Sequence, residues 1–303
     1  THFERYVEPF FGGGAMFIWA YEKNPAASFY INDINEHIIQ IYKAIKNDCE
    51  KFCQTVDRLE RAYLPLPSPE DIKTNKELQK KFKLEARGRH DWDAIYEVEP
   101  SRRHFYFKVR DRYAWKYADW DSTFEAGVLY FLMKTGFNGV WQINKNTNGR
   151  FGTPAGLLNQ KDKVYDKDNV HVWHEALQRC TILSLDFAEV VEKYADKNTF
   201  LFMDPPYRKS FTQYNVDFHD GEQLRVLDSL KVASERGAIG WLSNREAGDG
   251  FWEEHCGKEF PILKFNTTYT AGRRKKVISG EKVEYKAKKA VEVLITTGGN
   301  SEV

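Results

Sequence analysis

The residues whose types and spacing are best suited to chemistry lie just after position 200. Phe-Leu-Phe-Met at 200–203 predicts a short strand that is buried on both faces. The motif Asp204-Pro205-Pro206-Tyr207 follows directly. Because proline has no N–H to donate to a sheet ladder, the strand is predicted to end at Met203 or Asp204. A carboxylate, a stiff turn and a phenol ring therefore stand at the end of a strand, where open α/β sheets bind ligands.

These four residues offer two hydrogen-bond acceptors beside a flat ring. The carboxylate of Asp204 can accept a bond from an amine. The carbonyl of Pro205 is a second acceptor, and Pro206 has no N–H that would occupy it. Tyr207 presents a face on which a base can stack. The arrangement predicts a pocket for a planar group with an exocyclic amine; the alternative is an ordinary strand-ending turn, since Asp and Pro both favour turns.

A glycine-rich segment near residue 12 predicts a nucleotide-cofactor site. A strand is predicted over 3–7, and Glu8-Pro9 ends it before the turn Gly12-Gly13-Gly14 and a helix predicted at 16–22. The dinucleotide fingerprint is not satisfied, because Phe17 occupies the position of its third glycine. An acid at the strand end suits the amino group of S-adenosylmethionine better than a pyrophosphate. The glycines let the backbone approach that ligand.

Two further strand ends carry acids that can bind the same ligand. A strand predicted over 28–31 is followed by Asp33, at about the usual spacing of twenty residues for an acid that binds a ribose hydroxyl pair. Asp33 can instead cap the helix that follows, but Asn35 is the better cap candidate and leaves Asp33 free. A strand predicted over 181–185 ends at Asp186-Phe187, which can hold an adenine by its amine and its ring.

The strand pattern predicts an α/β fold. Strands are predicted near residues 3, 28, 181, 199, 238, 262 and 291. Their alternation with helical patterns indicates a mainly parallel sheet. A chain of 303 residues suits one large or two modest domains. No apolar run reaches membrane-spanning length and no signal peptide is visible, so we expect no membrane association.

The region between the second and third predicted strands has a different composition. From about 54 to 103 it is interrupted by prolines, polar and basic, which is typical of an insertion with exposed helices. An apolar helix is predicted over 123–135 and ends at Gly136. Residues 137–154 then combine Asn-Gly turn signals with amides, Lys and Arg between aromatic residues, which suits base edges and phosphates. A surface hairpin with polar tips is the alternative.

The net charge of +1 hides a local excess of basic residues. Residues 264–289 contain nine basic and two acidic side chains, a block that suits either a polyanion or a solvated face. The four cysteines are predicted to be reduced thiols. Cys49 and Cys53 lie four positions apart, but no Cys or His pair follows at zinc-finger spacing, so we predict no metal site.

Together these residues resemble the Dam-type adenine-specific DNA methyltransferases (D12 class, alpha group). The resemblance covers most of the chain. Its motifs are Val7–Ala15, Asn32–Asn35, Tyr106 with Arg110, Phe137–Gly139, Asn144-Lys145, Gly149–Phe151 with Pro154, Asp186-Phe187, Asp204–Tyr207, Ser243-Asn244 and Glu292–Ile295. Their order, with a recognition segment between the glycine motif and the Asp-Pro-Pro-Tyr motif, is more specific than any one of them.

The resemblance implies a Rossmann-like, seven-stranded, S-adenosylmethionine-dependent methyltransferase domain made of residues 1–48 and 164–303. It implies an inserted, mainly helical target-recognition domain at 49–163. The enzyme would move a methyl group from S-adenosylmethionine to the N6 amine of an adenine that is flipped out of double-stranded DNA and stacked on Tyr207. We expect a monomer or weak dimer in the cytoplasm of a prokaryotic or phage-infected cell.

The resemblance also implies a task for each motif residue. The catalytic residues are Asp204, Pro205, Pro206 and Tyr207. The cofactor-binding residues are Glu8, Phe10, Gly12, Gly14, Asp33, Asp186 and Phe187. The DNA-binding residues are Arg110, Asn138, Gln142, Asn144, Lys145, Arg150 and Pro154, to which the basic block adds Arg273 and Arg274.

The sequence departs from the family pattern at three places. Only Thr1 to Val7 precede Glu8, so the family's Lys-containing Ala-Gly-Gly-Lys motif is not in this sequence. The segment 54–103 is longer than usual, and Gln142 stands where GATC-specific members carry Arg. Two alternatives keep the fold: an N-methyltransferase acting on RNA or protein, and a catalytically silent DNA-binding relative. Asp204, in place of the Asn of the protein methyltransferases, favours DNA, as does the long recognition segment.

Gln142 generates a prediction about the recognised sequence. An arginine pairs with O6 and N7 of guanine, whereas the glutamine amide, with one donor side and one acceptor side, matches adenine. We therefore expect the enzyme not to require the guanine of GATC, and Gln142→Arg to shift preference towards guanine by about 1–3 kcal/mol. Single-molecule sequencing of DNA methylated by both proteins measures this. Strict GATC methylation by the wild type, or identical site profiles, would contradict it.

Overall fold

The structure, a computed structural model, divides into two compact units that are described separately here. It describes residues 3–77, 101–116, 119–143, 147–209, 218–257, 259–269, 275–279, 282–286 and 288–298. Unit 1 holds the described residues of 1–39, 179–212 and 216–303, and unit 2 holds those of 40–178. Four residues predicted to bind DNA, Asn144, Lys145, Arg273 and Arg274, lie outside the described residues.

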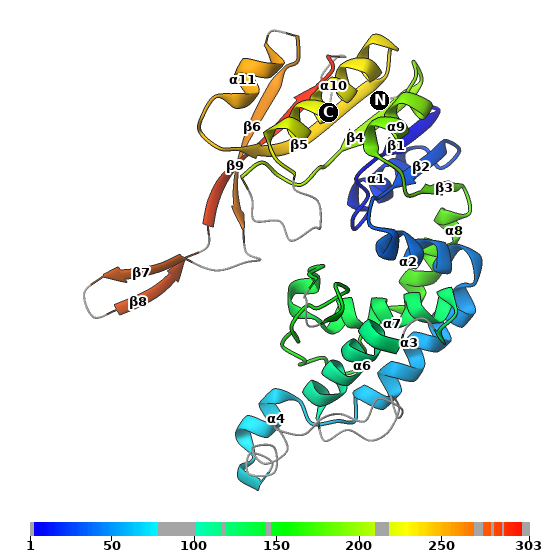
Figure 1. The fold of residues 1–303 in the computed structure, drawn as a ribbon, viewed down its shortest axis with the longest axis vertical. Coiled ribbons are helices and arrows are strands. Elements are labelled where there is room, and N and C mark those ends of the chain that lie inside the picture. The colour runs from blue at the N-terminus through cyan, green and yellow to red at the C-terminus, as the bar shows by residue number, and fades with distance from the viewer. Residues whose placement is uncertain are drawn as a thin grey trace. The chain divides into compact units, whose positions relative to one another are not determined.

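Unit 1 is built on a seven-stranded sheet with the strand order β3-β2-β1-β4-β5-β9-β6 (Figure 1). Strands β1 to β5 run parallel, and β9 pairs antiparallel with β5 and β6. The strands are β1 (Arg5–Glu8), β2 (Ser28–Asn32), β3 (Cys180–Leu183), β4 (Thr199–Met203), β5 (Ile239–Glu246), β6 (Ile262–Tyr269) and β9 (Lys288–Thr296). All seven predicted strands are confirmed, and β4 ends at Met203, as the two prolines require.

Helices cover both faces of this sheet. Leu201 and Met203 point to one face, where they pack in an apolar core with side chains of α9 and α10 such as Leu227. Phe200 points to the other face, where its ring lies 5.6 Å from that of Trp19 in α1. Each such buried side chain contributes about 1.5–3 kcal/mol to folding. The helices are α1 (Ala15–Lys23), α9 (Phe187–Tyr194), α10 (Asp220–Glu235) and α11 (Phe251–Cys256), while α2 (Glu36–Asn47) begins in unit 1 and continues into unit 2.

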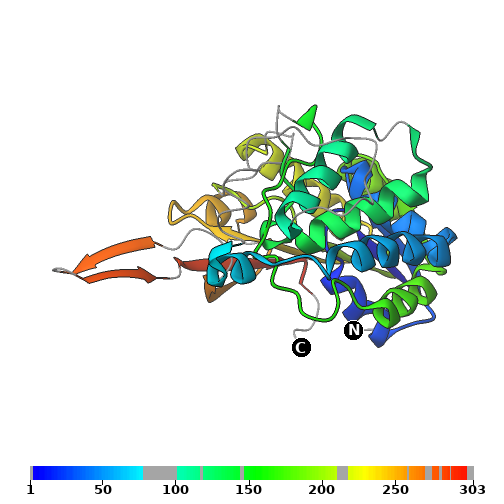
Figure 2. The same cartoon turned by 90° about the horizontal axis from the view of Figure 1, so that it is seen from below.

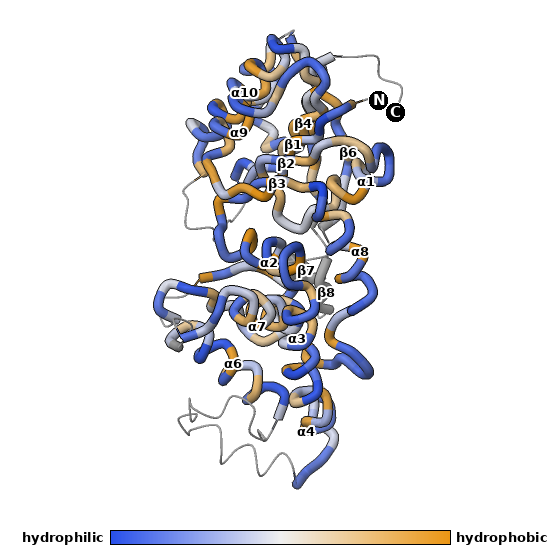
Figure 3. Tube along the Cα trace, turned by 90° about the vertical axis from the view of Figure 1, so that its right-hand side faces the viewer, coloured by the Kyte–Doolittle hydropathy of each residue, from blue (hydrophilic) through white to orange (hydrophobic). Residues whose placement is uncertain are grey.

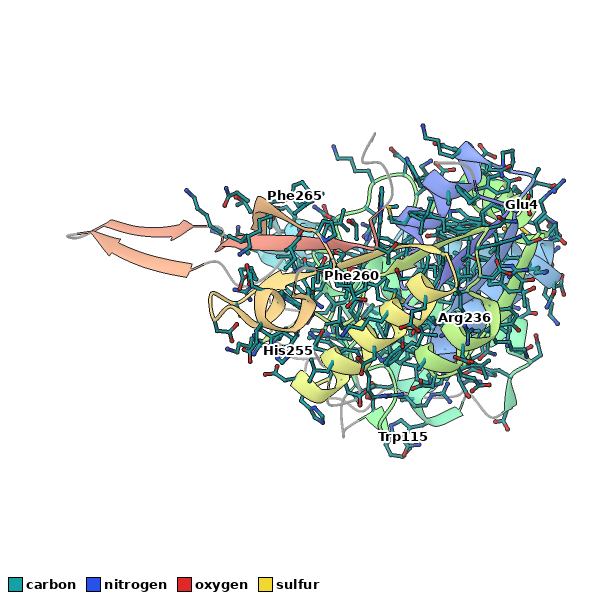
Figure 4. All side chains as sticks on the ribbon, turned by 90° about the horizontal axis from the view of Figure 1, so that it is seen from above. Glu4, Trp115, Arg236, His255, Phe260 and Phe265 are labelled. Carbon is teal, nitrogen blue, oxygen red and sulfur yellow. The ribbon has the colours of Figure 1, made fainter. Side chains whose placement is uncertain are left out.

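Hydropathy colouring and side-chain views agree with this layering. The tube of β4 is coloured as hydrophobic in Figure 3, in keeping with its sequence Thr-Phe-Leu-Phe-Met. Figure 4 labels Arg236 at the end of α10, where its guanidinium pairs with Glu192 of α9 and joins the two helices. Phe260 is buried, whereas Phe265 of β6 is exposed on the edge strand.

A separate hairpin of β7 (Lys275–Ser279) and β8 (Lys282–Lys286) lies between β6 and β9 in the chain (Figure 2). The sequence predicted only a block of basic residues in this stretch and neither of the two strands. Lysines interrupt the alternation of apolar and polar residues in this stretch. Too few apolar residues remain for that alternation to predict a strand.

Unit 2 is mainly helical. Its helices are α3 (Cys49–Tyr63), α4 (Pro69–Thr74), α6 (Arg102–Lys116), α7 (Ser122–Thr135), the 3-10 turn η2 (Phe137–Gly139) and α8 (Lys167–Leu177). Helix α3 packs on α7 through aromatic pairs such as Tyr63 with Phe131, whose ring centres lie 5.5 Å apart. No helix among the described residues of either unit is both long and apolar enough to cross a membrane.

The segment from about 54, predicted to be an insertion with exposed helices, contains the exposed helix α4 but begins inside a helix that is buried along one face. Helix α3 continues to Tyr63, because Val56 and Leu59 extend the buried face that begins with Phe52. Asp48 caps this helix through the N–H of Lys51. The later part of the predicted insertion, residues 78–100, lies outside the described residues.

The predicted polar hairpin is confirmed around Asn148-Gly149. Both residues have positive φ, 55° and 71°, as a tight hairpin turn requires. Ile143 and Phe151 form an antiparallel bridge, and Gly152 donates its N–H to the carbonyl of Gln142 at 2.7 Å. Asn138 has φ 53° but lies in the 3-10 turn η2, so this Asn-Gly pair does not form a second hairpin.

Candidate active site

The carboxyl ends of four neighbouring parallel strands carry the acids that the sequence singled out. Glu8 is the last residue of β1, Asp33 follows β2, Asp204 follows β4, and Asp186 lies shortly after β3. Because these strands are adjacent in the order β3-β2-β1-β4, their carboxyl ends form one edge of the sheet (Figure 1). The strand order reverses between β1 and β4, which is the position where open α/β sheets bind ligands.

Asp33 joins the glycine loop to the end of β2. Its Oδ2 accepts the N–H of Gly12 and its Oδ1 accepts the N–H of Asn35, each at 2.9 Å. Asn35 caps α2, since its Oδ1 accepts the N–H of His37 at 3.1 Å, so that prediction is confirmed. The expectation that Asp33 is left free is wrong, because both of its carboxylate oxygens accept hydrogen bonds from backbone N–H groups. Burial raises the pKa of Asp33, and the two backbone bonds oppose this.

The glycine loop presents exposed backbone. Gly12 and Gly14 take φ values of 47° and 69°, in the left-handed region that favours glycine. A Cβ placed on Gly12 or Gly13 would meet no heavy atom of the described residues within 4 Å. A ligand can therefore approach the main chain of this loop directly.

Glu8, at the end of β1, has only 2% of its surface exposed. The hydroxyl of Tyr6 donates to its Oε2 at 2.7 Å, and the N–H of Phe17 in the first turn of α1 also donates to the carboxyl. Burial raises the pKa of Glu8 well above its usual range. The bonds from Tyr6 and Phe17 oppose the rise, and the charges of Asp204 and Asp33 add to it. This carboxyl therefore holds its proton more tightly than an exposed glutamate does.

Two phenylalanines lie beside the end of β3. The rings of Phe10 and Phe187 have centres 5.1 Å apart, and the guanidinium of Arg225 lies 4.8 Å from the centre of the Phe187 ring. Asp186 caps α9 through the N–H of Ala188 and forms an ion pair with Arg225 at 2.9 Å. The sequence analysis missed Arg225, which lies far from Asp186 in the chain.

The Asp-Pro-Pro-Tyr motif places Asp204 and Tyr207 next to Ser243 of β5. The hydroxyls of Tyr207 and Ser243 lie 2.7 Å apart, and both residues hydrogen-bond to Asp204. Asp204 is exposed to solvent, yet the surrounding protein desolvates it enough to raise its pKa. The bonds from Tyr207 and Ser243 oppose this rise, and the charge of Glu292 adds to it.

Two buried amide side chains, those of Gln223 and Asn244, hydrogen-bond to the backbone of this motif and of the residue after it. Sequence reasoning did not identify this role. Gln223 of α10 donates its Nε2 to the carbonyl of Pro206 at 2.8 Å and accepts a bond from Nδ2 of Asn244 at 2.9 Å. Asn244 in turn accepts the N–H of Arg208 at 3.0 Å. A signal existed for Gln223, because it is a polar residue in helical phase with the buried Val226 and Leu227.

Arg208 anchors the chain directly after the motif. Its buried guanidinium binds both oxygens of Asp220 at 2.6 and 2.7 Å and both oxygens of Asp249 at 2.7 Å. It also lies 3.9 Å from the centre of the Phe251 ring. Such bidentate, charge-assisted bonds fix direction as well as distance. The backbone at Arg208 is therefore held through its side chain and its N–H.

In unit 2, the predicted DNA-binding residues differ in their surroundings. Asn138 and Pro154 are exposed, and Gln142 is half-buried. Arg110 binds Asp111 at 2.9 Å. Arg150 is buried, forms an ion pair with Glu125 and lies 4.5 Å from the centre of the Tyr113 ring. The guanidinium of Arg150 thus belongs to the interior of the unit.

Comparison with known proteins places the chain in a family. Residues 2–271 match the D12 class N6 adenine-specific DNA methyltransferases. The chain is 31% identical to type II methyltransferase M.MjaIII of Methanocaldococcus jannaschii, over 82% of this chain and 76% of that protein. It is 26% identical to M1.LlaDCHI of Lactococcus lactis subsp. cremoris (98% and 88%) and 25% identical to M.CviBI of Paramecium bursaria Chlorella virus NC1A (84% and 80%).

The mostly parallel seven-stranded sheet is consistent with a Rossmann-like methyltransferase. The chain belongs to the D12 class N6 adenine-specific DNA methyltransferase family, which confirms the resemblance found in the sequence. It is an enzyme that methylates adenine at specific sites in DNA. S-adenosylmethionine is the methyl donor that this family implies. The family match also decides against RNA or protein as the substrate and against a catalytically silent relative.

The buried Glu8 predicts an unusual pH dependence of stability. Burial raises its pKa, so the native state keeps a proton that the unfolded chain releases above a pKa of about 4.3. The contribution of Glu8 to stability therefore falls as pH rises from there through the native pKa. Gln cannot ionise, so Glu8→Gln should melt at a higher temperature than the wild type at pH 8, and this difference should vanish near pH 4.

Thermal unfolding between pH 4 and pH 8 measures this effect. Each 1 kcal/mol gained shifts Tm by about 2–4 °C for a domain of 150–250 residues. Glu189→Gln, on the exposed face of α9, is the matched control and should leave the pH profile unchanged. A Glu8→Gln profile parallel to that of the wild type would show that Glu8 does not carry the buried proton.

The bond from Gln223 to the carbonyl of Pro206 predicts a loss of rate without a loss of cofactor binding. Gln223→Glu keeps the shape and can still accept from Asn244, but it has no N–H for Pro206. We expect kcat to fall by about tenfold to a hundredfold, which is the loss that a displacement of the motif by about 1 Å would cause. The affinity for S-adenosylmethionine should not change. Single-turnover rates and calorimetry measure both quantities. Equal losses in rate and affinity would indicate a general structural role instead.

Proposed function

We propose that Asp204, Pro205, Pro206 and Tyr207 carry the methylation of adenine in double-stranded DNA. The observation that supports this most is an exposed Asp204 held by Tyr207 and Ser243 at the carboxyl end of a central strand. In this proposal the target adenine is flipped out of the duplex and stacks on Tyr207. Its amine donates one hydrogen to Asp204 and the other to the carbonyl of Pro205.

These two acceptors increase the electron density on the amine nitrogen. S-adenosylmethionine supplies an electrophilic methyl group when it is bound. Asp204 and Pro205 orient the nitrogen lone pair towards that group, and this orientation is the main catalytic contribution of the chain. Asp204 can also take the proton that the nitrogen loses after transfer, because burial raises the pKa of its carboxyl.

We propose that Glu8, Phe10, Gly12, Gly14, Asp33, Asp186 and Phe187 hold the cofactor. Three acids, Glu8, Asp33 and Asp204, lie close enough for their charges to raise the pKa of Glu8. A ligand that carries both an ammonium and a sulfonium group relieves this repulsion, so the arrangement suits S-adenosylmethionine. The exposed main chain of Gly12 and Gly13 leaves room for it. Asp33 would accept bonds from the ribose hydroxyls with the lone pairs that the backbone leaves unoccupied.

We propose that residues 49–163 form the target-recognition domain. Residues 1–48 and 164–303 would form the catalytic domain. We propose that Arg110, Asn138, Gln142 and Pro154 contact DNA, together with Asn144, Lys145, Arg273 and Arg274. Basic residues of this group would neutralise phosphates, which makes binding weaken with salt. We assign Arg150 a supporting role, because its guanidinium is buried against Glu125 and Tyr113.

The relatives suggest the biological setting. M.MjaIII, M1.LlaDCHI and M.CviBI are named type II methyltransferases. We therefore propose that this enzyme, acting as a monomer or weak dimer in the cytoplasm of a prokaryotic or phage-infected cell, is the modification half of a type II restriction–modification pair. It would protect the sites that a partner endonuclease cuts.

Asp204→Ala tests the catalytic assignment. Because Asp204 would hydrogen-bond the flipped amine, the variant should keep most of its affinity for S-adenosylmethionine and DNA but transfer methyl groups at least about a hundredfold more slowly. Transfer of a tritiated methyl group to DNA measures the rate, and calorimetry measures binding. Asp249→Asn, at an acid that holds Arg208 instead, is the comparison and should lose less rate. Transfer above about a tenth of the wild-type rate would overturn the assignment.

A further inference from the structure

Helices α3 and α8 of unit 2 bring two thiols and an imidazole together. Cys49 is the first residue of α3, Cys53 lies one turn later, and His171 comes from α8. The two Sγ atoms and a ring nitrogen of His171 all lie within 4.8 Å of one another. None of the three belongs to the residues proposed for methyl transfer, which lie in unit 1. The thiol–imidazole cluster, as we call these three residues, is therefore not explained by that reaction.

The distance between a thiol and the imidazole in this cluster fits a tetrahedral metal ion. Zinc binds cysteine sulfur at about 2.3 Å and histidine nitrogen at about 2.0–2.1 Å, so a tetrahedral angle separates the two ligand atoms by about 3.6 Å. Sγ of Cys49 lies 3.6 Å from Nδ1 of His171. Residues i and i+4 of a helix share one face, which allows Cys53 to complete the set.

His171 is held in place on both sides along α8. Before it, Lys167 binds Asp57 of α3 at 3.0 Å. After it, Nδ1 of His174 lies 2.7 Å from the carbonyl of Ile45, and Gln178 donates to the carbonyl of Lys46 at 2.9 Å. These bonds dock α8 on the helices that precede and contain the cysteines. The ligand atoms are thus positioned by the fold itself, which lowers the entropy lost on binding an ion.

We propose that Cys49, Cys53 and His171 bind one Zn²⁺ ion, with a water molecule as the fourth ligand. Two thiolates balance the charge of the ion, so the bound site is neutral overall and suits a place where both cysteines are buried. His171 is exposed, which gives the ion a path of entry and leaves space for the water. Three protein ligands and a water form a common coordination set for zinc.

Binding is an exchange of one metal ion for two protons. Each Zn–S bond forms as the thiol releases its proton to solvent, while neutral His171 donates a lone pair through its ring nitrogen. Burial raises the pKa of Cys53 to about 12 and also raises that of Cys49, whereas Lys167 opposes both rises. The affinity for zinc should therefore increase with pH. The ion would join α3 to α8 and stabilise unit 2.

The sequence did not predict this site because its third ligand is distant in the chain. His171 lies 122 positions after Cys49, and the spacing of the two cysteines matches no zinc-finger pattern. Only the packing of α8 on α3 brings the imidazole to the thiols.

The test is zinc binding by the 303-residue chain, reduced and stripped of metal with a chelator. Titration with Zn²⁺ against a chromophoric chelator should show one ion per chain. Because removing an outer partner of a metal ligand already costs about 10–100-fold in affinity, His171→Ala and Cys53→Ser should lose at least a hundredfold. Cys180→Ser, at a buried cysteine of β3, is the control and should bind like the wild type.

Three further measurements keep the result independent of folding defects. His171 is exposed, so His171→Ala should keep the helical circular dichroism of the wild type, and zinc should raise the melting temperature of the wild type but not of this variant. Cobalt should give the visible bands of a tetrahedral thiolate site in the wild type alone. The absence of stoichiometric zinc in the reconstituted wild type would overturn the proposal, as would equal affinities in the wild type and His171→Ala.

Discussion

The hydrogen bond from buried Gln223 to the carbonyl of Pro206 is the interaction on which the geometry of the candidate active site depends. Two consecutive prolines have no N–H, so the chain after β4 cannot be held by an ordinary sheet ladder. Side chains of α10 and β5 supply the missing bonds instead: Gln223 binds the carbonyl of Pro206, and Asn244 binds the N–H of Arg208. The same prolines that free the Pro205 carbonyl for a substrate thus require a buried amide network behind it.

Charge is distributed unevenly around this network. On one side, Arg208 is neutralised by Asp220 and Asp249 and packs on Phe251, so the chain leaving the motif is fixed by paired charges. On the other side, the charges of Asp204 and Asp33 add to the rise in the pKa of buried Glu8. Paired charges stabilise the backbone on the first side, whereas the acids on the second side would attract a cation. This division fits the proposed cofactor, which carries positive charge next to its reactive methyl group.

Unit 2 uses aromatic packing and capped helices where unit 1 uses a sheet. Its core joins α3 and α7 through pairs such as Tyr63 with Phe131, and the buried ion pair of Arg150 with Glu125 fixes the end of the polar hairpin. Separating the two partners of a buried ion pair costs free energy, because each would remain as an uncompensated buried charge. Such a pair therefore holds a loop in one position. Gln142 and Pro154, which are proposed to contact DNA, lie in the same segment as Arg150, and that ion pair attaches the segment to α7.

The sequence by itself determined where the seven strands of the main sheet lie and where β4 ends, because apolar runs and prolines act locally. Met203 ends β4 where the prolines begin, and Asn35 caps α2 as its residue type suggests. Contacts between distant segments were decided only by the tertiary structure. Gln223 reaches Pro206, Arg150 turns into the interior, and His171 approaches Cys49 because helices pack in one arrangement, and no local pattern encodes that packing.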